Sequence, residues 1–200
     1  MRDAWDRPLQ RGLRLALGLA LFGLSLALFA QAHLGVDPWT VFSQGISRRT
    51  DLSLGTVTVL TSLAVLLAWI PLHQRPGVGT IANALVVGPV LDLGVAVFPE
   101  PGTLPGQLGF VAIAIVGAAI GTGFYVGAGW GPGPRDGLMT GFAARGVPIG
   151  LARMGIELTV LVTGFLLGGT VGLATALYAI GIGALVQRTL PRLTVRPRPA

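Results

Sequence analysis

The sequence predicts an all-α membrane protein with six transmembrane helices in two inverted three-helix repeats. Three observations lead to this class. Hydrophobic residues make up 52% of the 200 residues and charged residues only 11%, whereas soluble domains are usually about 25% charged. Mean hydropathy is +0.74, and long charge-free intervals alternate with clusters of Pro and Gly. A stretch of the first half also aligns with the second half. Soluble-domain classes are therefore excluded.

The charge-free intervals set the predicted spans. A spanning helix needs about 20 mostly apolar residues, because about 30 Å of hydrocarbon is crossed at 1.5 Å per residue. The intervals and the breaks between them predict helices at 13–32, 55–72, 80–98, 108–126, 149–168 and 171–187. The domain plan is then an N-terminal segment (1–12), a transmembrane domain (13–190, with repeats at about 13–98 and 108–188) and a tail (191–200). The tail is rich in Pro and Arg and is expected to be disordered.

The distribution of arginines predicts the orientation. All 14 basic residues are Arg, and the formal net charge is +6. With six spans, the two ends and the loops around Arg75 and Arg145 lie on one side and hold eleven arginines, whereas Arg48 and Arg49 lie on the other. This bias predicts that both termini lie in the cytoplasm. The arginines form no stripe interleaved with aromatic residues, so a nucleic-acid partner is not expected.

The sequence lacks the residues that several kinds of chemistry require. The chain has no Cys, and its two His residues, His33 and His73, are too far apart to form a metal-ligand spacing. No hydrolase or metalloprotease motif is present. We therefore expect no metal, no cofactor and no enzymatic activity.

An internal repeat links the two halves. Residues 51–92 align without gaps on 146–187, and residues 35–49 align on 131–145. Three spans in each repeat place the second half upside down relative to the first, as in many secondary transporters. An old duplication without a transport role explains the same pattern. Small residues four apart recur in both halves and predict that the third and sixth spans pack on each other: Thr80, Ala84, Gly88, Thr175, Ala179 and Gly183.

Two breaks at corresponding positions are the first candidate site. They are LGVDPW (34–39) and GWGPGPRDGLM (129–139), each followed by a segment too short to span. Both segments are predicted to be half-helices or interfacial segments. The N-terminus of a half-helix favours an anion, with Asp37 and Trp39 at one and Arg135 and Asp136 at the other. The alternative is two ordinary loops, with Arg135 and Asp136 paired or bound to lipid phosphate.

Charged residues inside the predicted fifth span are the second candidate. Arg153 and Glu157 are four residues apart and share one helix face, and Glu157 lies about 12 Å into the membrane from residue 149. A charge at this depth costs about 2.5–3.5 kcal/mol, so it is expected to face the bundle interior or a water-filled cavity. Glu157 is a candidate to carry a proton or to pair with a cationic substrate. A structural ion pair, or an Arg153 that reaches to the interface, is the alternative.

Polar residues around a proline kink are the third candidate. The predicted third span contains Asn83, the Gly88–Pro89 kink and Asp92. Pro89 removes a helical hydrogen bond, which membrane helices tolerate where neighbours or water satisfy the freed carbonyl. We expect Asp92 to face an outer vestibule or a polar partner such as Gln44 or Ser43.

Three blocks together resemble the YczE/YitT-type bacterial membrane proteins: LGVDPW (34–39), GVGTIANALVVGPVLD (77–92) and GPRDGLM (133–139). The resemblance implies a multi-pass protein of the bacterial cytoplasmic membrane and assigns no catalytic residue. The second half lacks Asn and Pro at the positions that match Asn83 and Pro89.

The predicted function is that of a small secondary transporter or exporter of an unidentified small molecule. Its site lies at the repeat interface, where Arg135 or Arg153 holds an anionic group and Glu157 couples to protons. Its expected partners are the lipid bilayer, the small molecule and protons, and a homo-oligomeric state is left open. The alternative is a scaffold or regulatory subunit that acts through a partner protein.

Overall fold

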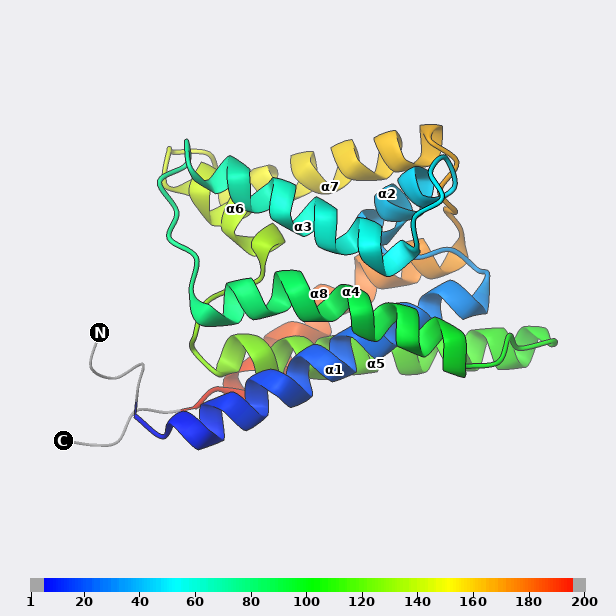
Figure 1. Cartoon of the computed structure of the whole chain (residues 1–200), viewed down its shortest axis with the longest axis horizontal. Helices are drawn as coiled ribbons and strands as arrows, with labels where there is room; N and C mark the ends of the chain where they lie inside the picture. The colour runs from blue at the N-terminus through cyan, green and yellow to red at the C-terminus, as the bar shows by residue number, and fades with distance from the viewer. Residues whose placement is uncertain (1–5, 196–200) are drawn as a thin grey trace.

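The computed structural model describes residues 6–195, and all its regular structure there is helical (Figure 1). Eight helices follow one another in the order α1 (Pro8–Ala32), α2 (Pro38–Ser47), α3 (Leu54–Trp69), α4 (Val78–Val97), α5 (Leu104–Gly127), α6 (Pro134–Ala143), α7 (Ile149–Leu166) and α8 (Leu173–Leu193). Five of them, α1, α4, α5, α7 and α8, are long and apolar enough to cross a membrane, whereas α3 is apolar but has only 16 residues. The chain is thus an all-α membrane protein.

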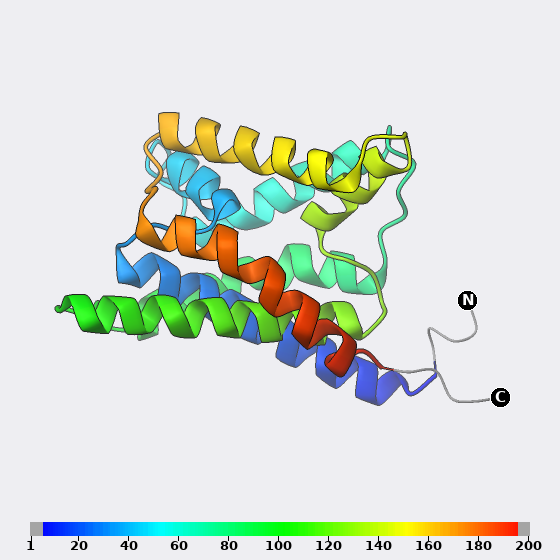
Figure 2. The same ribbon diagram turned by 180° about the vertical axis from the view of Figure 1, so that it is seen from behind.

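The helices form two layers (Figures 1 and 2). In one layer α1 packs against α4 and α5, and α5 packs against α8. In the other layer α2 packs against α3 and α7, while α6 packs against the same two helices. The main apolar core lies in the first layer around Leu19, Leu26 and Leu91, and a smaller cluster of Trp39, Val65 and Trp69 joins α2 to α3.

Several predicted boundaries differ from the structure at helix ends. Helix α1 starts five residues before the expected residue 13, because Pro8 at its first position favours helix initiation where no backbone donor is needed. Helix α8 continues through Pro191 to Leu193, so the first part of the predicted disordered tail is helical. Residues 1–5 and 196–200 of the two predicted terminal segments lie outside the described residues.

The two short helices begin at the prolines that the sequence singles out. Asp37 caps α2: its carboxylate accepts hydrogen bonds from the backbone N–H groups of Trp39 and Thr40, at 3.2 and 3.3 Å. Helix α6 starts at Pro134 without a side-chain cap. Both helices have ten residues, which corresponds to about 15 Å, half the thickness of the hydrocarbon layer.

The predicted packing of α4 on α8 is wrong. Helix α4 packs on α1 and α3, and helix α8 packs on α5. Instead, the matched residues at the starts of these two helices contact the Gly-containing connection that precedes the half-helix of the opposite half. The Thr80 hydroxyl donates to the Pro132 carbonyl at 2.7 Å, and Thr175 Oγ1 lies beside the break at Gly35.

Backbone hydrogen bonds make the same contact between opposite halves at both places. The Gly79 N–H donates to the Trp130 carbonyl at 2.8 Å, and the Ala174 N–H donates to the Leu34 carbonyl at 2.9 Å. The glycines that follow these carbonyls, Gly35 and Gly131, have φ of 98° and 118°, which only glycine adopts readily. Small-residue spacing predicted a close backbone approach correctly, but it does not specify which segment approaches.

The remaining matched glycines behave differently in the two halves. Gly88 of α4 lies against the Gly55 carbonyl of α3, so close that a Cβ at position 88 would overlap it. Their counterparts, Gly183 of α8 and Gly150 of α7, have no neighbouring atom within 4 Å of a built Cβ. Helices α3 and α4 are therefore closely packed, while α7 and α8 are separated.

Candidate functional site

A cavity of about 220 Å³ lies between the two layers, where the half-helices α2 and α6 begin. Seven of the eight residues proposed from the sequence as substrate-binding line it: Asp37, Trp39, Asn83, Arg135, Asp136, Arg153 and Glu157. They come from α2, α4, α6 and α7 and from the residue before α2. The volume is below the roughly 300–1,000 Å³ typical of sites for drug-sized ligands, so the cavity fits a smaller molecule.

The N-termini of the two half-helices meet at this cavity. Arg135, in the first turn of α6, pairs with the α2 cap Asp37 at 3.3 Å, and the Asp37 side chain is only 1% exposed. The Arg135 guanidinium also lies 5.1 Å from the centroid of the Trp39 ring, which is within cation–π range. Residues 98 positions apart in the sequence thus form one charged and aromatic cluster.

Three buried polar atoms at the cavity have no hydrogen-bond partner among the described residues. They are the second carboxylate oxygen of Asp37, the indole N–H of Trp39 and the amide nitrogen of Asn83. A buried polar group without a partner costs about 1–3 kcal/mol, and such groups are rare in native proteins. One acceptor and two donors are therefore left for a ligand or water.

The acidic residues of the cavity are placed unequally. Glu157 accepts a hydrogen bond from the guanidinium of Arg153 at 3.0 Å, and the two side chains are 27% and 48% exposed. The ion pair considered as an alternative for these two residues is thus present. Asp136 has no arginine partner within ion-pair distance in residues 6–195, and it accepts a hydrogen bond from the Tyr125 hydroxyl at 3.3 Å.

Asp92 lies outside this cavity, and its expected partners were wrong. Its carboxylate accepts hydrogen bonds from the Ser53 hydroxyl at 2.5 Å and from the Gly55 N–H at 2.7 Å. It therefore satisfies the free donors at the N-terminus of α3. Gln44 instead accepts from the backbone of Thr170 at 3.1 Å.

The sequence reasoning missed several residues of the cavity, although the internal repeat contains the signal for three of them. At the repeat offset of 95, Arg153, Glu157 and Asn83 correspond to Thr58, Ser62 and Tyr178. All three counterparts line the cavity. The repeat therefore predicts a site built from equivalent positions in both halves.

A second hollow, also of about 220 Å³, adjoins the cavity on the α7 side. Arg153, Glu157 and Pro38 line both spaces, and Gly150 and Leu161 line only the outer one. It occupies the place where α7 and α8 are separated. The charged pair therefore lies beside an opening on the side of the helix bundle.

Among residues 6–195, no group of three or more His, Cys, Asp or Glu side chains has the arrangement of a metal site. The site consists of paired charges, aromatic rings and unpartnered hydrogen-bonding groups. Such a set suits reversible binding of a polar molecule.

Comparisons with known proteins give the family. Residues 9–191 match the family of unknown function DUF6198. An uncharacterized protein of Haemophilus influenzae is 40% identical over 174 residues, which cover 86% of this chain and 80% of that protein. The uncharacterized membrane protein YczE of Bacillus subtilis is 31% identical over the same shares of the two chains. No solved structure matches. The chain therefore belongs to the DUF6198 family and is a relative of the YczE-type membrane proteins.

Proposed function

We propose that this protein is a small secondary transporter or exporter that binds a small polar molecule in the cavity between α2 and α6. The observation that carries the proposal is the meeting of two half-helix N-termini at a polar cavity inside an apolar helix bundle. Broken helices at corresponding positions of two halves mark the substrate sites of many secondary transporters.

The arrangement of the helices supports two inverted repeats of three spans each, with α3 as a short sixth span. Each helix of the second half runs opposite to its counterpart: α5 to α1, α6 to α2, α7 to α3 and α8 to α4 (Figure 1). The packing is matched as well, since α1 on α4 corresponds to α5 on α8, and α2 on α7 corresponds to α6 on α3. The pairs α3–α4 and α7–α8 break this match, because the first is packed and the second is open.

This asymmetry supplies a mechanism for alternating access. Two halves of equivalent fold can exchange conformations, so that α7 closes on α8 while α3 opens from α4. The exchange opens the cavity alternately on its two sides, as in transporters that rock one repeat against the other. Glu157 and Arg153 line the opening that is present here, so their ion pair is placed to be broken and remade during the exchange.

The charges of the cavity indicate how a substrate is held. Asp37 neutralises Arg135, and Arg135 retains further N–H donors for an anionic group. Asp136 and the unpartnered oxygen of Asp37 are acceptors for a cationic or hydroxyl group. A small molecule that carries both kinds of group satisfies both ends of the site. Glu157, released from Arg153, is the group proposed to take up the proton.

The test begins with a thermal-shift screen of the purified protein against small polar metabolites, followed by uptake and counterflow of the hits in proteoliposomes. Arg135→Ala and Glu157→Gln are expected to reduce ligand stabilisation and flux at least about tenfold, the effect of losing one charged hydrogen-bond partner. Arg75→Gln and Glu100→Gln, in exposed loop segments, are the matched controls and should leave both unchanged. Equal flux in the cavity variants and the controls would refute the assignment of the site.

One observation favours the second candidate, a scaffold or regulatory subunit. Helix α7 buries only Ala152 and Gly164, so most of its surface is available to another membrane helix. This function predicts a protein that co-purifies through α7, together with no ligand in the screen and no flux.

A further inference from the structure

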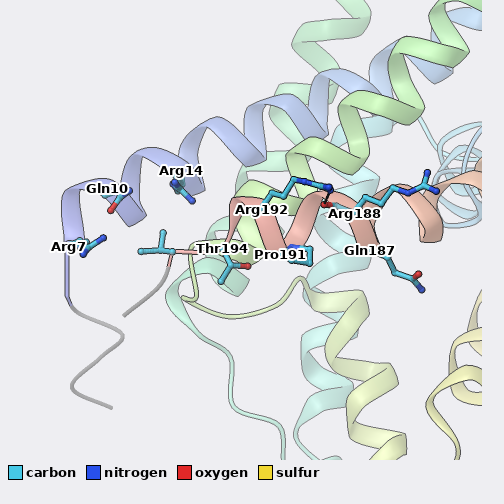
Figure 3. Close-up of a pocket in the computed structure, with 9 residues that line it drawn as sticks. Arg7, Gln10, Arg14, Gln187, Arg188, Pro191, Arg192 and Thr194 are labelled. Carbon is cyan, nitrogen blue, oxygen red and sulfur yellow. Dashed lines mark hydrogen bonds between the residues drawn. The ribbon is translucent and has the colours of Figure 1, made fainter. Parts of the chain in front are cut away.

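A groove of about 720 Å³ lies between the start of α1 and the end of α8 (Figure 3). Four arginines from the two ends of the chain surround it: Arg7, Arg14, Arg188 and Arg192. The exposed Pro191 adds apolar surface between them, and the buried Val195 also lines the groove. Its volume falls within the roughly 300–1,000 Å³ typical of ligand sites.

These four arginines have no counter-charge within residues 6–195. No carboxylate lies within ion-pair distance of any of them. Three other arginines are paired with carboxylates, namely Arg11, Arg135 and Arg153. Three more donate to carbonyl oxygens, namely Arg48, Arg49 and Arg145. The groove therefore brings together four arginines, from both ends of the described chain, that have no carboxylate partner there.

Two of the guanidinium groups are held in position by the end of α8. Arg14 donates to the Leu193 carbonyl, and Arg192 donates to the Arg188 carbonyl at 2.6 Å. A guanidinium has about five N–H donors, so both keep donors for a further acceptor. The side chains of Arg7 and Arg188 make no hydrogen bond or ion pair with the described residues, and both are exposed.

The depth of the groove identifies the ligand. Arg14 and Arg188 are the first charges beyond the charge-free intervals 15–36 and 158–187. They therefore lie where the apolar layer of the bilayer ends and the phosphates of its lipids begin. We propose that the groove binds the phosphate of an anionic phospholipid headgroup, with its glycerol and upper acyl chains against Pro191.

A soluble phosphate-bearing anion shares this chemistry and is the other source of the ligand. Gln187 lines both the groove and the central cavity, so the two spaces adjoin. An anion on its way to the cavity would also meet these arginines. The lipid is favoured because the groove combines its charges with apolar surface at the level of the headgroups.

The experiment measures binding by native mass spectrometry and thermal shift on the full chain in neutral detergent. The probes are phosphatidylglycerol, phosphatidylcholine and inorganic phosphate. Phosphatidylglycerol is expected to remain bound and to raise the melting temperature, while phosphatidylcholine and phosphate do not. Each arginine near a membrane surface contributes about fivefold to the attraction for anionic lipid, so the double variant Arg7→Gln/Arg188→Gln should weaken binding about 25-fold.

The matched control pair is Arg188→Gln against Arg75→Gln, because each removes one exposed arginine charge. The proposal expects about fivefold weaker phosphatidylglycerol binding for the first and no change for the second. Equal loss in both variants would show a non-specific charge effect and would overturn the site. Stabilisation by inorganic phosphate that equals the effect of phosphatidylglycerol would overturn the assignment to lipid. Because the substituted side chains make no bond in the described structure, both variants should keep the melting temperature of the lipid-free protein.

Discussion

Substitution of the matched glycines tests the asymmetry between the two halves most sharply. A Cβ at position 88 would overlap the Gly55 carbonyl oxygen and would lie 2.6 Å from Val59 Cγ2. Ordinary contacts begin at 3.4 Å, so Gly88→Ala forces α3 and α4 apart by about 1 Å, and such overpacking costs about 1–3 kcal/mol. Gly183→Ala meets no atom within 4 Å and gains up to about 1 kcal/mol of helix propensity.

The two variants should therefore differ by about 1–4 kcal/mol in the free energy of unfolding, in opposite directions from the wild type. At about 2–4 °C per kcal/mol for a chain of this size, the difference amounts to several degrees in melting temperature. The assay is thermal unfolding of the purified proteins in one detergent. Gly55→Ala and Gly150→Ala form a second matched pair, since a Cβ at 55 lies 2.5 Å from the Asp92 carboxylate and a Cβ at 150 meets nothing within 4 Å.

The same variants separate stability from transport. If α7 closes on α8 as α3 closes on α4, the methyl group that Gly183→Ala adds would obstruct that closed state by about as much as Gly88→Ala obstructs the present one. A penalty of about 2 kcal/mol lowers the population of the closed state about 30-fold. Gly183→Ala should then be stable and slow in flux. A melting temperature lowered as much as that of Gly88→Ala would refute the reasoning.

Further predictions concern the supports of the site. Asp92→Asn weakens two hydrogen bonds, to Ser53 and to the start of α3. Thermal unfolding should show a destabilisation of about 1–3 kcal/mol with ligand affinity unchanged. A loss of ligand affinity without a loss of stability would place Asp92 in the site. Trp69→Phe removes the indole N–H that donates to the Pro134 carbonyl at 2.9 Å. It should cost about 0.5–1.5 kcal/mol in the same assay and should weaken ligand binding by loosening the start of α6, whereas unchanged binding would show that this hydrogen bond does not position the site.

Much of the site could be predicted from local signals, because proline and a capping carboxylate mark a helix start wherever it lies in the fold. Asp37–Pro38 and Gly133–Pro134 are such signals, and both half-helices begin there. The cost of placing charge in an apolar span likewise indicated that Arg153 and Glu157 line a polar space. These predictions required no knowledge of which helices are neighbours.

The errors arose where the identity of a neighbour mattered. Thr80 and Thr175 have the small-residue spacing of a helix interface, but they contact the connections before the half-helices of the opposite halves. Asp92 lies three residues after Pro89 in α4 and accepts a hydrogen bond from the N-terminus of α3, a contact that no local pattern specifies. Thr58 was missed because a hydroxyl in a membrane helix commonly bonds its own backbone, as Thr58 does to the Leu54 carbonyl.

The central claim is that the two halves cross the membrane in opposite senses around one cavity. Arg145 donates to the Pro71 and Leu72 carbonyls, so the loops that follow α3 and α6 lie at the same end of the molecule. Because the chain has no native Cys, single cysteines introduced at positions 75, 145 and 100 can be labelled with a membrane-impermeant maleimide in intact cells and in inverted vesicles. The account predicts that cysteines at positions 75 and 145 react only in inverted vesicles and that a cysteine at position 100 reacts only in intact cells. Labelling of positions 75 and 100 from the same side would contradict it.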